Sequence, residues 1–225
     1  MIDFHTHILP NMDDGPKSVD ESLEILNLLE KQNVKLVFLT SHFYPSNESI
    51  DDYLSRRDKA FKELNYSGNL ELKLGCELHY YNGISQSDKL DKLCLEGSNI
   101  LLLELPFDTN INQNMFNEII SLSNKGIRVM LAHIERYGVD EEKIIDLKSK
   151  GILIQANCEF IIGSLFDHKG LKWLKNGYID VIGSDCHNLG LRKPNYLEAT
   201  SKITNKYGEE FCCYFMEKSS RILGV

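Results

Sequence analysis

Short apolar runs alternate with amphipathic stretches along the 225-residue chain. The runs are rich in Val, Ile and Leu and are bounded by polar turns, as buried strands are, whereas the stretches between them repeat apolar residues at helical spacing. Strands are predicted at 2–7, 34–41, 70–78, 100–105, 127–132, 152–156 and 178–183. Helices are predicted at 18–32, 49–64, 112–125, 140–150, 164–176 and from 195 to the end, with a break near Gly208.

This alternation predicts an α/β fold. Successive strand–helix units give parallel strands joined by right-handed crossovers. No Gly-x-Gly-x-x-Gly follows the first strand, which counts against a dinucleotide-binding sheet. About seven units in 225 residues favour a small, distorted TIM-like (β/α)7 barrel that forms one domain over residues 1–225.

Potential metal ligands stand at the C-terminal ends of these strands. His5 and His7 alternate in the first strand, and residues two apart on a strand point to the same face. Asp14 follows in the next turn. The later strand ends carry, in chain order, His42, Glu77, Glu104, His133, Asp185 and His187. In a parallel barrel such ends converge on one mouth, where the active sites of these barrels lie.

The five imidazoles and four carboxylates of this set suit divalent transition metals. One ion takes about four to six ligands, so the set is large enough for two or three ions if carboxylates bridge them. Three divalent ions against four carboxylates would leave a local charge of about +2, which attracts phosphate. Clustered ions also activate water and clamp the attacking and leaving oxygens of an in-line displacement. The donor set therefore predicts hydrolysis of a phosphate ester.

Composition narrows the class of protein. With 25 Lys and Arg against 33 Asp and Glu, the formal net charge is −8, which counts against general binding to nucleic acid or to an anionic membrane surface. No apolar run approaches the roughly 20 residues that cross a bilayer, and no secretory signal pattern opens the sequence. None of the six cysteines forms a Cys-x-x-Cys pair. We therefore expect a cytoplasmic protein with reduced thiols and no Cys-type zinc site.

Taken together, the motifs resemble the PHP (polymerase and histidinol phosphatase) superfamily. Within it, the chain is most similar to the bacterial manganese-dependent protein tyrosine phosphatases of capsule and exopolysaccharide operons. The resemblance runs over almost the whole chain. It rests on DFHTHILP at 3–10, DDG at 13–15, SVDESL at 18–23, SH at 41–42, GCE at 75–77, ELP at 104–106, HIERY at 133–137 and SDCHN at 184–188, with Arg192 and Pro194.

The resemblance implies a PHP-type barrel with a three-ion cluster at its mouth, with manganese as the first choice and iron or zinc as alternatives. One ion would be held by His5, His7, Glu77 and Asp185, a second by Glu77, Glu104 and His133, and a third by Asp14, His42 and His187. Arg136 and Arg192 would bind the phosphate, because a planar guanidinium pairs with two phosphate oxygens. A hydroxide that bridges the ions would attack phosphorus without a covalent phosphoenzyme.

Three functions stay open at this point. The resemblance implies a tyrosine phosphatase that acts on the tyrosine-rich tail of a kinase controlling polysaccharide export. The alternatives are a small-molecule phosphatase, for example for histidinol phosphate or a sugar phosphate, and a non-enzymatic metal-binding protein. The intact ligand set counts against the non-enzymatic protein, and the lack of a basic groove counts against a nuclease. The sequence does not decide whether the chain forms a homo-oligomer.

The alternative chemical mechanism is attack on phosphorus by a cysteine thiolate. Cys186 and Arg192 have the spacing of the phosphate-binding loop in cysteine-dependent phosphatases. That loop wraps phosphate with small residues and leads into a helix, whereas here His-Asn-Leu-Gly-Leu intervenes and Pro194 disfavours a helix at Lys193. The thiol also lies between two predicted ligands, so on an extended chain it would point away from both.

Other residues near the predicted mouth have roles that the sequence leaves open. His79 is outside the family pattern, and is either an outer contact of the site or a surface histidine. Asp13 and Glu135 are expected to support ligands rather than to bind metal, with Asp13 as an alternative to Asp14.

Two aromatic residues, Tyr44 and Tyr137, are expected near the mouth, where their rings could stack on an aromatic leaving group. His168 stands between Asp167 and Lys169 and is expected to be solvated.

Overall fold

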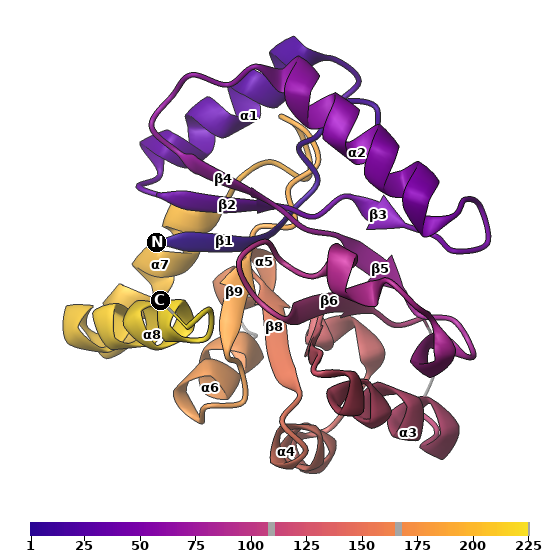
Figure 1. Cartoon of the computed structure of the whole chain (residues 1–225). Helices are drawn as coiled ribbons and strands as arrows, with labels where there is room; N and C mark the ends of the chain where they lie inside the picture. Colours follow the sequence, from indigo (N-terminus) through magenta and orange to yellow (C-terminus); the bar gives the residue numbers. More distant parts are fainter. Residues whose placement is uncertain (108–110, 165–167, 225) are drawn as a thin grey trace.

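The computed structural model describes residues 1–107, 111–164 and 168–224. Its strands form a curled parallel sheet with helices packed around the outside (Figure 1). The strands are β1 (Ile2–Thr6), β2 (Leu36–Leu39), β3 (His42–Phe43), β4 (Glu71–Leu74), β5 (Glu77–His79), β6 (Ile100–Glu104), β7 (Arg128–Leu131), β8 (Leu153–Asn157) and β9 (Val181–Gly183).

The α-helices are α1 (Val19–Lys31), α2 (Ile50–Leu64), α3 (Gln113–Ser121), α4 (Glu141–Ser149), α5 (Cys158–Ile162), α6 (Lys169–Lys175), α7 (Tyr196–Tyr207) and α8 (Glu209–Arg221). Short 3-10 helices are η1 (Ile84–Gln86), η2 (Leu90–Leu93), η3 (Leu122–Lys125) and η4 (Ile134–Tyr137). Among the helices described, none combines the length and apolar character needed to span a bilayer.

The strands form two hydrogen-bonded ladders, and within each ladder they follow chain order. One ladder is β1–β2–β4 and the other is β3–β5–β6–β7–β8–β9, and every pairing is parallel. The predicted strands at 34–41 and 70–78 are each interrupted, and the backbone N–H of Glu77 donates to the C=O of Thr40 at 3.1 Å across the interruption. The N–H of Asp185 donates to the C=O of His5 at 2.8 Å, which joins the last strand to the first. The predicted distorted α/β barrel is therefore confirmed.

The inward side chains change from apolar to polar along a strand. On β6, Leu102 lines an apolar interior, and Glu104 continues the same face two residues later. On β8, Leu153 lies in the same apolar cluster, and Gln155 and Asn157 follow it. The two-residue period thus gives the barrel a dry interior and a polar mouth at the C-terminal ends of the strands.

Side-chain caps and one glycine define several helix ends. Ser18 Oγ accepts the N–H of Glu21 at 3.2 Å at the start of α1, and Asn112 Oδ1 accepts the N–H of Met115 at 2.9 Å at the start of α3. The predicted break at Gly208 separates α7 from α8, and its φ of 89° is one that glycine adopts readily.

The region after β8 differs from the prediction. The sequence predicts a helix over 164–176; residues 165–167 of it lie outside the described residues, and α6 covers only Lys169–Lys175. Helix α5, which the sequence analysis missed, begins directly after β8 and has five residues, too few to show a helical repeat. Gly170 of α6 lets the two helices approach closely, because a Cβ there would lie 2.2 Å from the carbonyl oxygen of Phe160.

Gly170→Ala is therefore expected to lower the free energy of unfolding by about 1–3 kcal/mol, because the added methyl group overlaps backbone atoms of α5. Urea titration followed by circular dichroism measures this change. Gly190→Ala is the matched control: a Cβ there meets nothing closer than Asn188 Oδ1 at 3.4 Å. The control should change the free energy of unfolding by less than about 0.5 kcal/mol. Equal stability of the two variants would contradict the close packing of α5 and α6.

Candidate metal centre

Four imidazoles converge on the side chain of Glu77. This carboxylate stands at the start of β5 and is buried, and its Oε2 lies 3.1 Å from both His5 Nε2 and His7 Nε2. His42 Nδ1 lies 2.9 Å from the same oxygen. His133 Nε2 lies 2.9 Å from the other oxygen, Oε1. Four imidazoles from three strands, β1, β3 and β7, therefore surround one carboxylate.

Glu104, at the end of β6, forms the neighbouring part of the cluster. Its Oε1 lies 3.4 Å from His133 Nε2, and its Oε2 lies 3.6 Å from His42 Nδ1. His79 Nδ1 lies 3.1 Å from Glu104 Oε2, and the His79 side chain is 30% exposed. Of the two roles left open for His79, the structure supports an outer contact of the site.

Asp14 and His187 form the part of the cluster that is nearest to solvent. His187 Nε2 lies 3.1 Å from Asp14 Oδ1, and His42 Nε2 lies 3.8 Å from the same oxygen. The rings of His7 and His187 stack with their centroids 3.9 Å apart. Because the side chain of Asp14 is 62% exposed, this part of the cluster can be reached from outside.

Asp185 closes the cluster between the first and last strands. Its Oδ1 lies 3.6 Å from His5 Nε2 and 3.5 Å from His7 Nε2. The φ of Asp185 is 52° and that of His133 is 29°, a left-handed region that residues other than glycine seldom occupy. Each residue is the second one after a strand, β7 or β9, so these turns redirect the side chains into the mouth. Backbone strain that the surrounding structure holds in place is common at functional sites.

All nine predicted ligands lie in one cluster, but their closest groups differ from the predicted sets. Donor atoms within 4.8 Å of one another form three groups: His5, His7 and Glu77; His42, Glu77 and Glu104; and His7, Asp14, His42 and His187. His42 thus stands where His133 is expected in the second set, and His7 joins the third. Which donors share an ion therefore stays a prediction.

The residues present fit a metal site. Three buried donor atoms, Glu77 Oε2, His42 Nδ1 and His187 Nε2, lie close to other polar atoms but form no hydrogen bond of suitable geometry. Buried polar atoms normally have partners, because leaving one unpaired costs about 1–3 kcal/mol. Divalent cations in the donor groups that contain these residues would satisfy the three atoms; His187 belongs to a different group from Glu77. Imidazole nitrogens and carboxylate oxygens together suit Mn²⁺, Fe²⁺ or Zn²⁺.

Electrostatics keep Glu104 charged and His187 neutral. Burial opposes the charge on Glu104, but hydrogen bonds from imidazoles outweigh it and lower the pKa of Glu104 to about 2. Burial and the nearby His7 lower the pKa of His187 to about 3. Burial also opposes the charge on His133, but hydrogen bonds to Glu104 and Glu77 raise the pKa of His133 to about 9. A metal would have to displace a proton from His133, whereas His187 is already neutral at pH 7.

Asp13 contacts the predicted ligand His7 and two backbone N–H groups. Its Oδ2 lies 2.8 Å from His7 Nδ1 and accepts the backbone N–H of His42 at 2.9 Å. Its other oxygen accepts the N–H of Gly15 at 2.9 Å. Both oxygens are therefore engaged in orienting the loop and the imidazole, and the neighbouring Asp14 reaches the cluster instead.

Gln155 and Asn157 of β8 contact the cluster, and the sequence analysis did not identify them. Gln155 Oε1 accepts the backbone N–H of His133 at 2.6 Å and lies 3.2 Å from His5 Nδ1. Gln155 donates to Asn157 Oδ1 at 3.0 Å, and Asn157 donates to Asp185 Oδ2 at 2.8 Å. The available signal was two amide side chains on one face at the C-terminal end of an otherwise apolar strand.

The two tyrosines expected near the mouth have different positions. Tyr137 is buried, and its hydroxyl accepts the N–H of Leu105 at 3.0 Å and lies 3.1 Å from His133 Nδ1. It therefore positions an imidazole and is not available to stack on a substrate. Tyr44 remains at the mouth, with its ring centroid 5.1 Å from that of His42.

The structure also bears on the remaining residues. Cys186 is fully buried in the apolar core, and burial raises the pKa of its thiol well above the usual value, which counts against a thiolate nucleophile.

Glu135 accepts the N–H of Asn157 at 3.2 Å and is an outer partner, as expected. His168 is exposed at the start of α6, in agreement with a solvated residue.

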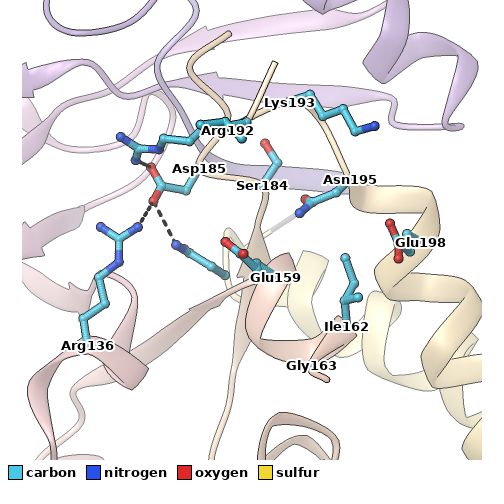
Figure 2. A pocket seen from close by; sticks show the side chains of 12 residues that line it. Arg136, Glu159, Ile162, Gly163, Ser184, Asp185, Arg192, Lys193, Asn195 and Glu198 are labelled. Atoms are coloured by element: carbon cyan, nitrogen blue, oxygen red, sulfur yellow. Dashed lines mark hydrogen bonds and ion pairs between the residues drawn. The ribbon is translucent and has the colours of Figure 1, made fainter. Parts of the chain in front are cut away.

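Arg136 and Arg192 approach the cluster from its rim (Figure 2). Arg136 Nη2 donates to Asp185 Oδ2 at 2.7 Å, and Arg192 Nη2 donates to Asp185 Oδ1 at 2.9 Å. Arg192 Nη1 also donates to Asp14 Oδ2 at 3.2 Å. Both arginines line a pocket of about 220 Å³ beside Asp185. Two guanidinium groups therefore stand where an anion would meet the donor cluster.

Gln155→Leu tests the support from β8, because leucine has a similar size but leaves the buried N–H of His133 without an acceptor. We expect the free energy of unfolding to fall by about 1–3 kcal/mol, measured by denaturant titration. Gln86→Leu, at an exposed position, is the matched control and should be close to neutral. If both variants unfolded like the unmodified protein, the hydrogen bonds of Gln155 would not contribute to stability.

Comparison with known proteins shows sequence relatives over the whole described length. The sequence model described as "Capsular polysaccharide synthesis, CpsB/CapC" matches residues 1–223. "Tyrosine-protein phosphatase CpsB" of Streptococcus pneumoniae is 30% identical over 226 residues, which cover 92% of this chain and 91% of that protein. "Tyrosine-protein phosphatase YwqE" of Bacillus subtilis is 26% identical over 99% of this chain and 91% of that protein.

Solved structures have the same fold. A chain from the crystal structures of YwqE from Bacillus subtilis and CpsB from Streptococcus pneumoniae, described as metal-dependent tyrosine phosphatases, matches with a TM-score of 0.82 and 24% identity over 99% of this chain and 94% of that one. The phosphotriesterase homology protein of Escherichia coli matches with a TM-score of 0.58 and 12% identity over 99% and 98% of the two chains. At these identities the likeness concerns the fold. On the sequence match, the chain belongs to the CpsB/CapC family of capsular polysaccharide synthesis.

Proposed function

We propose that this protein is a metal-dependent protein tyrosine phosphatase, a hydrolase that removes phosphate from phosphotyrosine. The observation that carries the proposal is the meeting of nine metal-binding donors and two arginines at one mouth of a parallel barrel. The names of the relatives, CpsB of Streptococcus pneumoniae and YwqE of Bacillus subtilis, support the same activity.

The nine predicted ligands would hold a cluster of divalent ions, for which we propose three ions and Mn²⁺ as the first choice, with Fe²⁺ or Zn²⁺ as alternatives. Bound divalent ions supply positive charge to phosphoryl oxygens and lower the pKa of water to near neutral. Glu77 is the candidate bridging ligand, because its two oxygens face different imidazoles, His5, His7 and His42 on one side and His133 on the other.

Three imidazoles are held so that the same ring nitrogen faces Glu77. Each Nε2 points to Glu77, and each Nδ1 has a partner outside the cluster: Gln155 for His5, Asp13 for His7 and Tyr137 for His133. Partners of this kind fix the orientation and the tautomer of a histidine ligand. Gln155, Asp13 and Tyr137 are therefore positioning residues, which act through the imidazoles.

Arg136 and Arg192 would bind the phosphoryl oxygens. Asp185 already orients both guanidinium groups, and their side chains are only 34% and 36% exposed. A planar guanidinium binds two oxygens of a phosphate at once, and its hydrogen bonds to an anion are stronger than those between neutral groups. The partly exposed mouth gives a phosphorylated side chain access to them.

For the substrate, we propose the tyrosine-phosphorylated tail of a cytoplasmic kinase that controls polysaccharide export. The family description, capsular polysaccharide synthesis, supports this pathway, and the names of the relatives support tyrosine as the phosphorylated residue. A small-molecule phosphomonoesterase would use the same metal site, so the two functions differ in the leaving group that the mouth accepts.

The direct test is hydrolysis of a tyrosine-phosphorylated peptide by the purified protein, with released phosphate measured. Chelation should abolish the activity, and added Mn²⁺ should restore it. Hydrolysis of histidinol phosphate or a sugar phosphate, but not of the peptide, would replace the proposed function with the small-molecule one. Hydrolysis of the peptide that survives complete metal removal would contradict the metal-dependent mechanism.

One variant tests phosphate binding by an arginine, and a second separates the metal site from a thiolate mechanism. Arg192→Ala should lower kcat/KM for the peptide by about 10²–10³-fold, because a charged partner of the phosphoryl oxygens is lost. Cys186→Ala should keep its activity per folded molecule, because the thiol is buried in the core and away from solvent. An inactive Cys186→Ala with an intact fold and full metal content would overturn this assignment.

A further inference from the structure

Phe107 is an exposed aromatic residue beside the candidate metal centre. It stands three residues after Glu104 and is 54% exposed. Its ring lies nearly parallel to that of His133, with centroids 6.1 Å apart and planes inclined by 21°. His133 Nε2 in turn lies 2.9 Å from Glu77. One imidazole therefore separates the exposed ring from the centre of the cluster.

The same ring contacts a residue that would bind the phosphate. Arg136 Cζ lies 5.9 Å from the centroid of the Phe107 ring, and Arg136 Nη2 donates to Asp185 at 2.7 Å. A guanidinium over an aromatic ring is attracted by the negative charge of the ring face. Phe107 is thus linked both to a candidate ligand and to a candidate phosphate-binding side chain.

Exposure alone would not distinguish Phe107. Single apolar side chains on the surface are normal, and the described residues include other exposed ones, Ile145, Leu191, Leu197 and Tyr214. Tyr44 is the other ring at the mouth, but it is only partly exposed and packs near two imidazoles, His42 at 5.1 Å and His79 at 5.4 Å between centroids. Phe107 is more than half exposed, and it also contacts the candidate ligand His133 and the candidate phosphate-binding residue Arg136.

We propose that Phe107 is the platform on which the aromatic ring of the substrate stacks, and that it gives the site its preference for aryl over alkyl phosphate esters. This inference rests on the proposed phosphatase function. In a phosphotyrosyl group a single oxygen joins phosphorus to the ring, so a phosphate held by Arg136 places the ring near the side chain that packs against Arg136. Offset or edge-to-face contacts between two rings then favour an aryl group over an alkyl group.

The test compares two inhibitors with the same charged group, phenylphosphonate and methylphosphonate, in the manganese-supplied hydrolysis of the phosphotyrosyl peptide. In Phe107→Ala, the inhibition constant of phenylphosphonate should rise roughly three- to tenfold, because one ring contact is lost. The inhibition constant of methylphosphonate should stay unchanged. Phe107→Tyr keeps the ring and should behave like the unmodified protein.

Ile145→Ala is the matched control, because Ile145 is 52% exposed and lies on α4, which contributes no predicted ligand. It should leave both inhibition constants unchanged. If Phe107→Ala weakens both inhibitors equally, or neither, the inference is overturned while the proposed function stands. If the unmodified protein does not hydrolyse the peptide with metal supplied, the proposed function fails and this inference fails with it.

Discussion

The buried carboxylate of Glu77 needs positively charged partners, and this requirement determines how the other residues of the site are arranged. Glu77 is fully buried, and an isolated charge in such a position would cost several kcal/mol. Its partners are His5 and His7 at the end of β1, His42 of β3 and His133 after β7. The curled sheet brings these strand ends together, so the charge of Glu77 can be balanced only when the barrel is closed.

The closure of the barrel depends on close approach between the first and last strands. A Cβ at Gly183 would lie 2.6 Å from His5 Cβ, so only glycine lets β9 run this close to β1. Directly after it, the left-handed backbone of Asp185 redirects the carboxylate toward the imidazoles. Asp185 then contacts both arginines, which connects the architecture of the sheet to the charge at the rim of the mouth.

Much of this site could be predicted from the sequence, because two general properties of parallel β-strands determine where its residues lie. The two-residue period of a strand puts His5 and His7 on one face, and the parallel arrangement collects strand ends such as Glu104 at one edge. The grouping of donors could not be predicted, since the position of His42 depends on the interruption between β2 and β3. Gln155 was missed because the pair of amides at this strand end does not reveal its partners, which come from other strands.

The structure also shows why position near a ligand in the sequence is a poor guide to exposure. Tyr137 and Phe107 each follow a predicted ligand by three or four residues. The 3-10 helix η4 turns Tyr137 back under His133, where its hydroxyl is hydrogen-bonded, whereas Phe107 stays exposed at the mouth.

The central claim is that the donors around Glu77 hold divalent ions. Anomalous X-ray diffraction from crystals grown with Mn²⁺, recorded on both sides of the manganese absorption edge, tests it most directly. We expect more than one manganese peak, with at least one peak within ligand distance of Glu77 and the imidazoles of His5 and His7. A folded protein at saturating Mn²⁺ with no peak at Glu77, or with manganese only at surface carboxylates, would contradict it.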